Sequence, residues 1–315
     1  MRSWQNIQPY SRELSRLYPG LFIILLDQSS SMGTKLEERG RQTTKAEVVT
    51  RHVNTIIQEM INNAGVEEND PGRRKKNAYL SVLGYDDKVI SLLSANPSNY
   101  MPVDIPTLAA NPPLEVPEIH IVRDLNNKII RQFEEKKKAW VKIRVGRNTN
   151  MHLAFRQATE IIDTWLRTPA DEIAPGLGKQ QPHTESFPPV VINVTDGYFT
   201  GSNPRSIVDD LRRIGTQNGN VLVFNCHFTT ENRTECIFPK NVSEVEGLDR
   251  HGYAREMFYL SSEIPETLRR RAEKTMKRPI EVGARCVIYN AKLDTLIQFL
   301  RWGTVDISAG TGTRG

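Results

Sequence analysis

The stretch LLDQSSSMG, from Leu25 to Gly33, joins an apolar run to a carboxylate and three serines. The run itself, LFIILL at 21–26, is typical of a short strand buried on both faces of a parallel sheet. Asp27, Ser29 and Ser31 then stand at alternate positions beyond its end. On its own this pattern is weakly specific, because aspartate and serine commonly bind backbone amides in turns.

Two further loops carry the same kind of side chain. The apolar run VVINVT ends at Asp196 in the sequence TDG, and Thr149 in GRNTN directly precedes an amphipathic segment at 151–166. Together the three loops offer two carboxylates and three hydroxyls, with no histidine or cysteine among them. Because hard oxygen ligands suit Mg²⁺ and Mn²⁺, the sequence predicts an all-oxygen metal site if the fold brings these loops together.

The elements that must position these loops alternate between buried strands and amphipathic helices. Strands are expected at 21–26, 190–195 and 220–228 and, around an Asp86-Asp87 turn, twice within 78–93; helices are expected at 45–65, 151–166, 206–215, 265–277 and 293–302. This alternation predicts an α/β fold with a doubly wound, mostly parallel central sheet flanked by helices on both faces. Ligands of such sheets bind beyond the carboxyl ends of the strands.

The chain is expected to hold one main domain at 20–303, preceded by an N-terminal extension at 1–19 and followed by a flexible tail at 304–315. A long insertion, at about 94–145, interrupts the domain. Three local interpretations accompany this division: a proline-rich loop at 94–117, a charged helix at 124–140 and a short edge strand at 257–262.

Composition places the chain among ordinary globular proteins. It has 315 residues, 38% of them hydrophobic, and a net charge of +5. Three cysteines without a CxxC pair argue against a disulfide framework and against structural zinc, and they favour a reducing compartment. The first residues carry no apolar signal sequence, and LFIILL is too short to cross a bilayer, so a cytoplasmic location is expected.

The basic clusters leave two interpretations open. They lie at Arg73–Lys76, Lys136–Lys138 and Arg269–Arg271. A solvated surface is the simpler interpretation, and a surface for an acidic protein partner is the functional one. Nucleic-acid binding is the least favoured, because it usually needs aromatic residues interleaved with the basic ones.

With its D-x-S-x-S motif, distant threonine and TDG aspartate in this order, the sequence resembles a von Willebrand factor A (vWA) domain with a metal-ion-dependent adhesion site (MIDAS). The resemblance extends from about Gly20 to Trp302, and it implies that Mg²⁺ or Mn²⁺ is the cofactor. The implied metal residues are Asp27, Ser29, Ser31, Thr149 and Asp196. In this family the neutral hydroxyls leave the ion electrophilic, with an open position for an Asp or Glu of a partner.

The resemblance implies a metal-dependent protein-binding module that acts as a scaffold or adaptor without catalysis of its own. Intracellular bacterial relatives of the tellurium-resistance type suggest a signalling or stress-response system, with a protein kinase, a PP2C-type phosphatase or an AAA+ ATPase as candidate partners. The alternative is a metal-dependent hydrolase or phosphatase at the same site. That reaction needs a nearby general base, and the sequence shows none beyond His152, which is expected on a helix surface.

Overall fold

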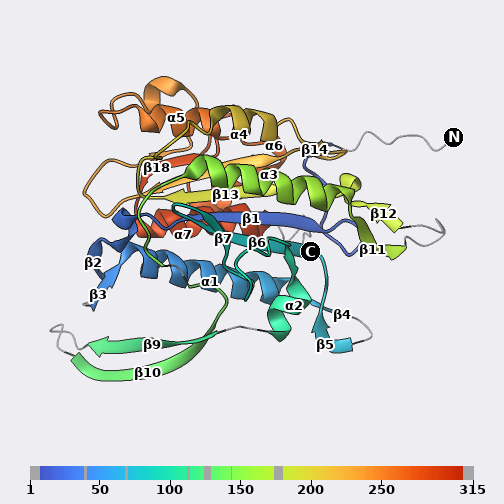
Figure 1. Ribbon diagram of the computed structural model, residues 1–315, viewed down its shortest axis with the longest axis horizontal. Helices are drawn as coiled ribbons and strands as arrows, with labels where there is room; N and C mark the ends of the chain where they lie inside the picture. The colour runs from blue at the N-terminus through green and yellow to red at the C-terminus, as the bar shows by residue number, and fades with distance from the viewer. Residues whose placement is uncertain are drawn as a thin grey trace.

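The computed structural model describes residues 8–38, 41–67, 70–111, 114–123, 129–142, 144–173 and 180–307. Its centre is an eight-stranded sheet with the order β17-β18-β16-β13-β1-β6-β7, in which β8 also pairs with β6 (Figure 1). The strands are β1 (Gly20–Asp27), β6 (Ala78–Tyr85), β7 (Val89–Ser91), β8 (Val103–Asp104), β13 (Val190–Thr195), β16 (Leu222–Phe228), β17 (Cys236–Ile237) and β18 (Val287–Ala291).

The five strands β18, β16, β13, β1 and β6 run parallel, and the short strands β17, β7 and β8 are antiparallel at the edges. Every residue of β1 and β13 is buried, as the continuous apolar runs predict. The predicted fold class is therefore confirmed: the sheet is mostly parallel, and helices cover both of its faces.

Alternate residues of β1 point into two different cores. Phe22, Ile24 and Leu26 pack in the core beneath α1 (Lys45–Asn63), α2 (Ile105–Ala110), α6 (Glu266–Met276) and α7 (Leu293–Arg301). Leu21, Ile23 and Leu25 pack in the core beneath α3 (Met151–Arg167) and α4 (Arg205–Leu211). Figure 1 shows α3, α4 and α5 (Tyr253–Leu260) above the sheet and α1 below it.

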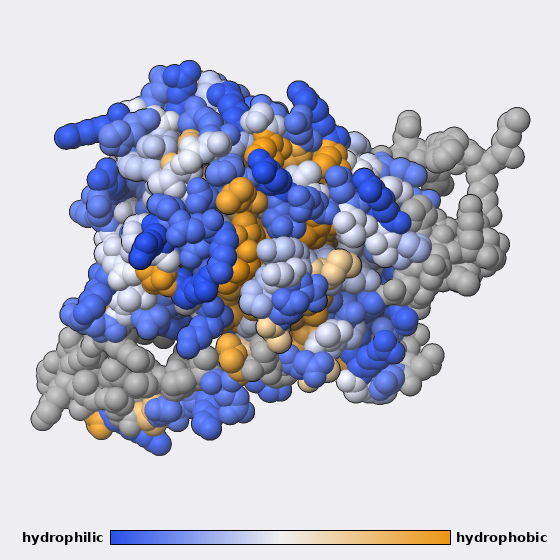
Figure 2. Space-filling view, viewed as in Figure 1, coloured by the Kyte–Doolittle hydropathy of each residue, from blue (hydrophilic) through white to orange (hydrophobic). Residues whose placement is uncertain are grey.

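Short antiparallel ribbons extend the connections between these elements. They are β2 (Lys35–Glu38) with β3 (Arg41–Thr44), β4 (Val66–Glu67) with β5 (Asp70–Arg74), β11 (Pro169–Ile173) with β12 (Gln180–Pro182), and β14 (Gly215–Thr216) with β15 (Gly219–Asn220). The described part of the chain holds no helix long and apolar enough to cross a membrane. In Figure 2, apolar surface gathers in a band over the middle of this view, and polar residues surround it.

The prediction of a charged helix at 124–140 is wrong. Residues Ile129–Ala139 form strand β10, which pairs antiparallel with β9 (Leu114–Arg123) from Ala139↔Leu114 to Ile129↔Arg123. The helix propensity of its glutamates and lysines yields to cross-strand pairing with the valine- and isoleucine-containing β9. Residues 124–128 lie outside the described residues.

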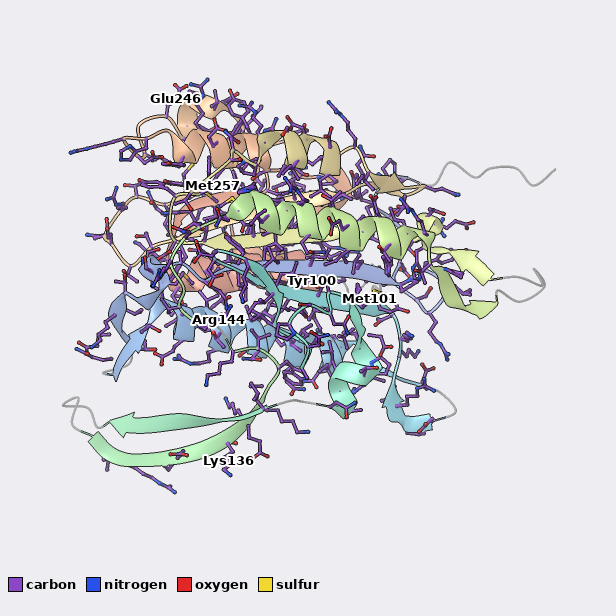
Figure 3. The ribbon with its side chains drawn as sticks, in the orientation of Figure 1. Tyr100, Met101, Lys136, Arg144, Glu246 and Met257 are labelled. Carbon is purple, nitrogen blue, oxygen red and sulfur yellow. The ribbon has the colours of Figure 1, made fainter. Side chains whose placement is uncertain are left out.

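This hairpin forms an arm beside the body of the molecule, and Figure 3 labels Lys136 on it, on the opposite side of the sheet from Met257. The arm is anchored at its base. Asn54 of α1 accepts hydrogen bonds from the backbone N–H groups of Trp140 (2.7 Å) and Val141 (2.9 Å). The Trp140 indole is buried and donates to the carbonyl of Leu108 at 2.7 Å.

Three other expectations need correction. The edge strand expected at 257–262 is instead the end of α5, because Met257, Phe258 and Leu260 fill one buried helical face. The loop expected at 94–117 contains α2, whose Pro106 sits in the first turn, where its missing N–H costs nothing. The tail does not begin at 304, since Trp302–Asp306 form a π-helical turn in which Thr304 and Val305 are buried; residues 308–315 lie outside the described residues.

Candidate metal centre

Asp27 ends β1 with its carboxylate fully buried and held on both oxygens. Its Oδ1 accepts the backbone N–H of Ser29 at 2.7 Å, and its Oδ2 accepts the hydroxyl of Thr195 at 2.5 Å. Burial, and to a smaller extent the charge of Asp196, raises the Asp27 pKa to about 6 against the opposing effect of these hydrogen bonds. An ionised Asp27 is therefore a buried charge that a cation would stabilise.

The two alternate serines lie side by side in the turn after β1. Their Oγ atoms are 2.9 Å apart, and Ser31 Oγ donates to Asp196 Oδ1 at 2.7 Å. The 3-10 turn Ser30–Gly33 brings Ser31 back towards the sheet. Gly197 permits this approach, because a Cβ at that position would lie 3.3 Å from Ser31 Oγ. Asp27, Ser29, Ser31 and Asp196 thus form one connected cluster.

Thr149 reaches the same edge of the sheet on an adjoining loop. It is buried, and its N–H donates to Thr200 Oγ1 at 3.0 Å while its carbonyl accepts the Thr200 N–H at 2.9 Å. Its loop also meets the serine turn, since the Arg147 carbonyl accepts the Ser30 N–H at 3.4 Å. These backbone contacts place the Thr149 loop against the serine turn, and the role of Thr149 as a ligand remains a prediction.

Lys45 is part of this cluster, and the sequence analysis missed it. Its Nζ lies 2.7 Å from Asp196 Oδ2, with the lysine side chain 10% exposed and the aspartate side chain fully buried. Lys45 is the first residue of α1, where the helix dipole disfavours a cation. A lysine at the first position of a helix, beyond the β2–β3 ribbon that follows the serine turn, was the available signal.

His227 lies at the end of β16, in register with Thr195. Its ring stacks on Tyr289, with the ring centroids 4.3 Å apart, and its Nδ1 accepts the Asn290 N–H at 3.3 Å. Burial lowers the His227 pKa to about 4, with Asp196 opposing this effect. At neutral pH this imidazole is an uncharged packing group, as its place in a buried strand predicts.

The residues of the cluster fit a divalent ion. Two buried carboxylates, Asp27 and Asp196, face one ammonium, so the cluster carries one uncompensated negative charge. Buried charges of this kind are normally paired or bound to metals. Among the described residues, no group of three or more His, Cys, Asp or Glu is placed so that it could hold a metal ion, so any metal here depends on the serine and threonine hydroxyls. Such oxygen donors suit Mg²⁺ or Mn²⁺.

The basic loop Arg73–Lys76 lies far from this cluster. Arg74 contacts the carbonyl of Asn62 near the end of α1, and Lys45 begins the same helix. The helix has 19 residues, which separates its ends by about 28 Å at 1.5 Å per residue. Lys76 is engaged by Asp104 at 3.1 Å.

No family model matches the chain, and no curated protein does. Among solved structures, proximal thread matrix protein 1 from the mussel byssus is 12% identical, with a TM-score of 0.43 over 94% of this chain and 49% of its own. Another structure of that protein, described with a zinc-occupied MIDAS motif, is 12% identical, with a TM-score of 0.32 over 69% of this chain and 37% of its own.

Two prokaryotic structures are also similar. The ArnB paralog VWA2 from Sulfolobus acidocaldarius is 13% identical, with a TM-score of 0.31 over 70% of this chain and 37% of its own. BatB from Bacteroides thetaiotaomicron is 12% identical, with a TM-score of 0.39 over 91% of this chain and 98% of its own. The chain spans about half the length, or less, of the mussel and Sulfolobus proteins.

Identities and TM-scores this low carry no argument about this chain. The evidence for the fold and the site is the chain's own: the mostly parallel sheet, and the D-x-S-x-S, threonine and TDG loops that meet at the carboxyl ends of its strands.

Proposed function

We propose that this chain is a vWA-type module that binds Mg²⁺ or Mn²⁺ through Asp27, Ser29, Ser31, Thr149 and Asp196. A bound ion would supply an electrophile with an open position for a carboxylate of a protein partner. The observation that carries the proposal is the hydrogen bond between Ser31 and Asp196, which joins the ends of β1 and β13 around buried carboxylates.

The arrangement favours ligand capture over hydrolysis. Ser29 and Ser31 are neutral ligands, so they would neutralise little of the positive charge of an ion. The two carboxylates are already hydrogen-bonded or ion-paired to other groups. Thr195 and the Ser29 N–H hold Asp27, while Lys45 holds Asp196. Hydrolysis would need a general base beside the ion. The imidazole of His227, at the end of the neighbouring strand β16, is stacked and already hydrogen-bonded, so we propose a scaffold or adaptor without catalysis.

The partner's contribution is one Asp or Glu that completes the coordination of the ion. A charge-assisted contact of this kind, shielded from water, can anchor an interface. A kinase, phosphatase or AAA+ ATPase of a bacterial stress or signalling system, in the cytoplasm, is the setting that we propose for this binding.

A peptide array tests the proposal directly. Each peptide with a central Asp or Glu is printed beside a twin carrying Asn or Gln, and the chain is applied with Mn²⁺ or with EDTA. We expect binding only to acidic peptides and only with Mn²⁺. Ser31→Ala should abolish it, whereas Ser30→Ala should not, because Ser30 is an exposed neighbour in the same turn. Binding that ignores EDTA would contradict the proposal.

A further inference from the structure

Lys45 occupies an unusual position for a lysine. It begins α1, where the exposed N–H groups and the helix dipole favour anions. The capping of the helix does not need it, because Thr44 accepts the Glu47 N–H at 3.2 Å and the Glu47 carboxylate accepts the Thr44 N–H at 2.8 Å. A lysine is also rarely this buried without a partner. Its place in the fold therefore points to its partner, Asp196.

The backbone fixes Lys45 against the metal cluster. Its N–H donates to the Thr34 carbonyl at 3.1 Å, and the Thr34 N–H donates to the Ser31 carbonyl at 3.0 Å. The ammonium then reaches Asp196 Oδ2 at 2.7 Å, while the other oxygen of this carboxylate accepts the Ser31 hydroxyl. Both oxygens of Asp196 are therefore engaged, one by a proposed metal residue and one by a cation of the chain itself.

We propose that Lys45 is the resident cation of this site. It neutralises Asp196 when no metal is bound, and it lowers the affinity of the site for a divalent ion. This inference rests on the proposed function. With Lys45, the cluster has a net charge of −1 before an ion binds and +1 afterwards; without it, these values would be −2 and 0. The loaded site therefore keeps a positive charge that only an outside anion can neutralise.

This charge balance makes metal and partner depend on each other. Lys45 raises the energy of the metal-loaded site, and a partner carboxylate lowers it again, so metal and carboxylate should bind with positive coupling. A nearby cation lowers the proton affinity of a carboxylate by about one to three powers of ten. A divalent ion carries twice the charge of a proton, so the same cation repels it more strongly. We therefore expect at least a tenfold effect of Lys45 on metal affinity.

The test is a calorimetric titration of the chain with Mn²⁺ alone, which measures the affinity for the ion. Lys45→Met should bind Mn²⁺ at least tenfold more tightly than the wild type, and Lys45→Arg, which keeps the charge, should stay near the wild type. Lys35→Met is the matched control, because Lys35 is an exposed lysine just beyond the serine turn. It removes the same charge without the contact to Asp196, so its affinity should stay near the wild-type value.

Lys45→Gln guards against a folding failure, since it removes the charge and keeps a hydrogen-bond donor for Asp196. It should also bind Mn²⁺ more tightly than the wild type, and Mn²⁺ should raise its melting temperature more than that of the wild type. If the wild type binds Mn²⁺, and Lys45→Met and Lys45→Gln bind it no more tightly than the wild type, this inference is overturned while the proposed metal site stands. If neither the wild type nor the variants bind Mn²⁺, the proposed metal site itself fails.

Discussion

Ser31 and Asp196 are 165 residues apart in the chain, yet the hydroxyl of one donates to the carboxylate of the other at 2.7 Å. The contact exists because β1 and β13 are adjacent parallel strands, paired from Phe22↔Val190 to Leu26↔Val194. Their carboxyl ends therefore coincide, and the loops beyond them meet.

Beneath this site, a chain of buried polar side chains crosses the sheet. Tyr85 OH donates to Asn193 Oδ1 (2.8 Å), Asn193 Nδ2 donates to Asn225 Oδ1 (3.0 Å), and Asn225 Nδ2 donates to Ser261 Oγ (2.9 Å). Asn193→Leu would remove the acceptor of the Tyr85 hydroxyl bond and the donor to Asn225 Oδ1. We expect a loss of about 2–4 kcal/mol in the free energy of unfolding, measured with urea. Tyr85→Phe, which leaves only one group unpaired, should cost less; equal stability of all three proteins would contradict this.

The buried His227 should make stability depend on pH. Its pKa is about 4 in the folded chain and near 6.5 when unfolded, so between these values the unfolded chain binds a proton that the folded chain rejects. His227 therefore destabilises the fold as pH falls from 6.5 to about 4, by about 3 kcal/mol in all.

His227→Phe keeps the ring on Tyr289 and removes this titration. Asp27, whose raised pKa gives the opposite slope, is present in both proteins and cancels in the comparison. Urea unfolding at pH 7.5, 6 and 4.5 should show the wild type losing stability relative to His227→Phe as pH falls. A constant difference across this range would refute the prediction.

Gly303 lies where the last helical turn meets the sheet. A Cβ there would come within 2.8 Å of Ile192 Cδ1 and 2.9 Å of Phe224 Cδ2, both in the buried core. Gly303→Val should therefore lower the free energy of unfolding by about 1–3 kcal/mol through overpacking, as thermal or urea unfolding would measure. An unchanged stability would mean that the residues after 302 pack loosely, as a tail would.

The basic loop should not guide an acidic partner to the metal. Arg74 contacts Asn62 near the far end of α1, about 26 Å along the helix from Lys45, and this is well beyond the screening length of about 8 Å at physiological salt. Arg73→Glu with Arg74→Glu should leave the association rate of an acidic peptide unchanged. Arg147→Glu, in the loop beside Ser30, should slow that association and make it less sensitive to salt. The reverse pattern would locate the interface at the basic loop.

The continuous apolar strands and the polar loops after them could be predicted, because burial and ligand chemistry leave local signals. Thus Asp27, Ser29, Ser31 and Asp196 meet at the predicted edge of the sheet. Strand β10 could not be predicted alone, since its EEKKK run suits an exposed helix or ribbon equally and the choice depends on pairing with β9. Lys45 was missed for a similar reason: its partner lies 151 residues away in the chain.

Whether the serine turn binds a divalent ion can be measured by calorimetric titration with Mg²⁺ and Mn²⁺ of three proteins: the wild type, the double variant Ser29→Ala plus Ser31→Ala, and Ser30→Ala. We expect one ion per chain with equal affinity for the wild type and Ser30→Ala, and at least a tenfold loss of affinity for the double variant, since it removes two of the neutral ligands. Equal affinity in all three proteins, or no binding by the wild type, would contradict it.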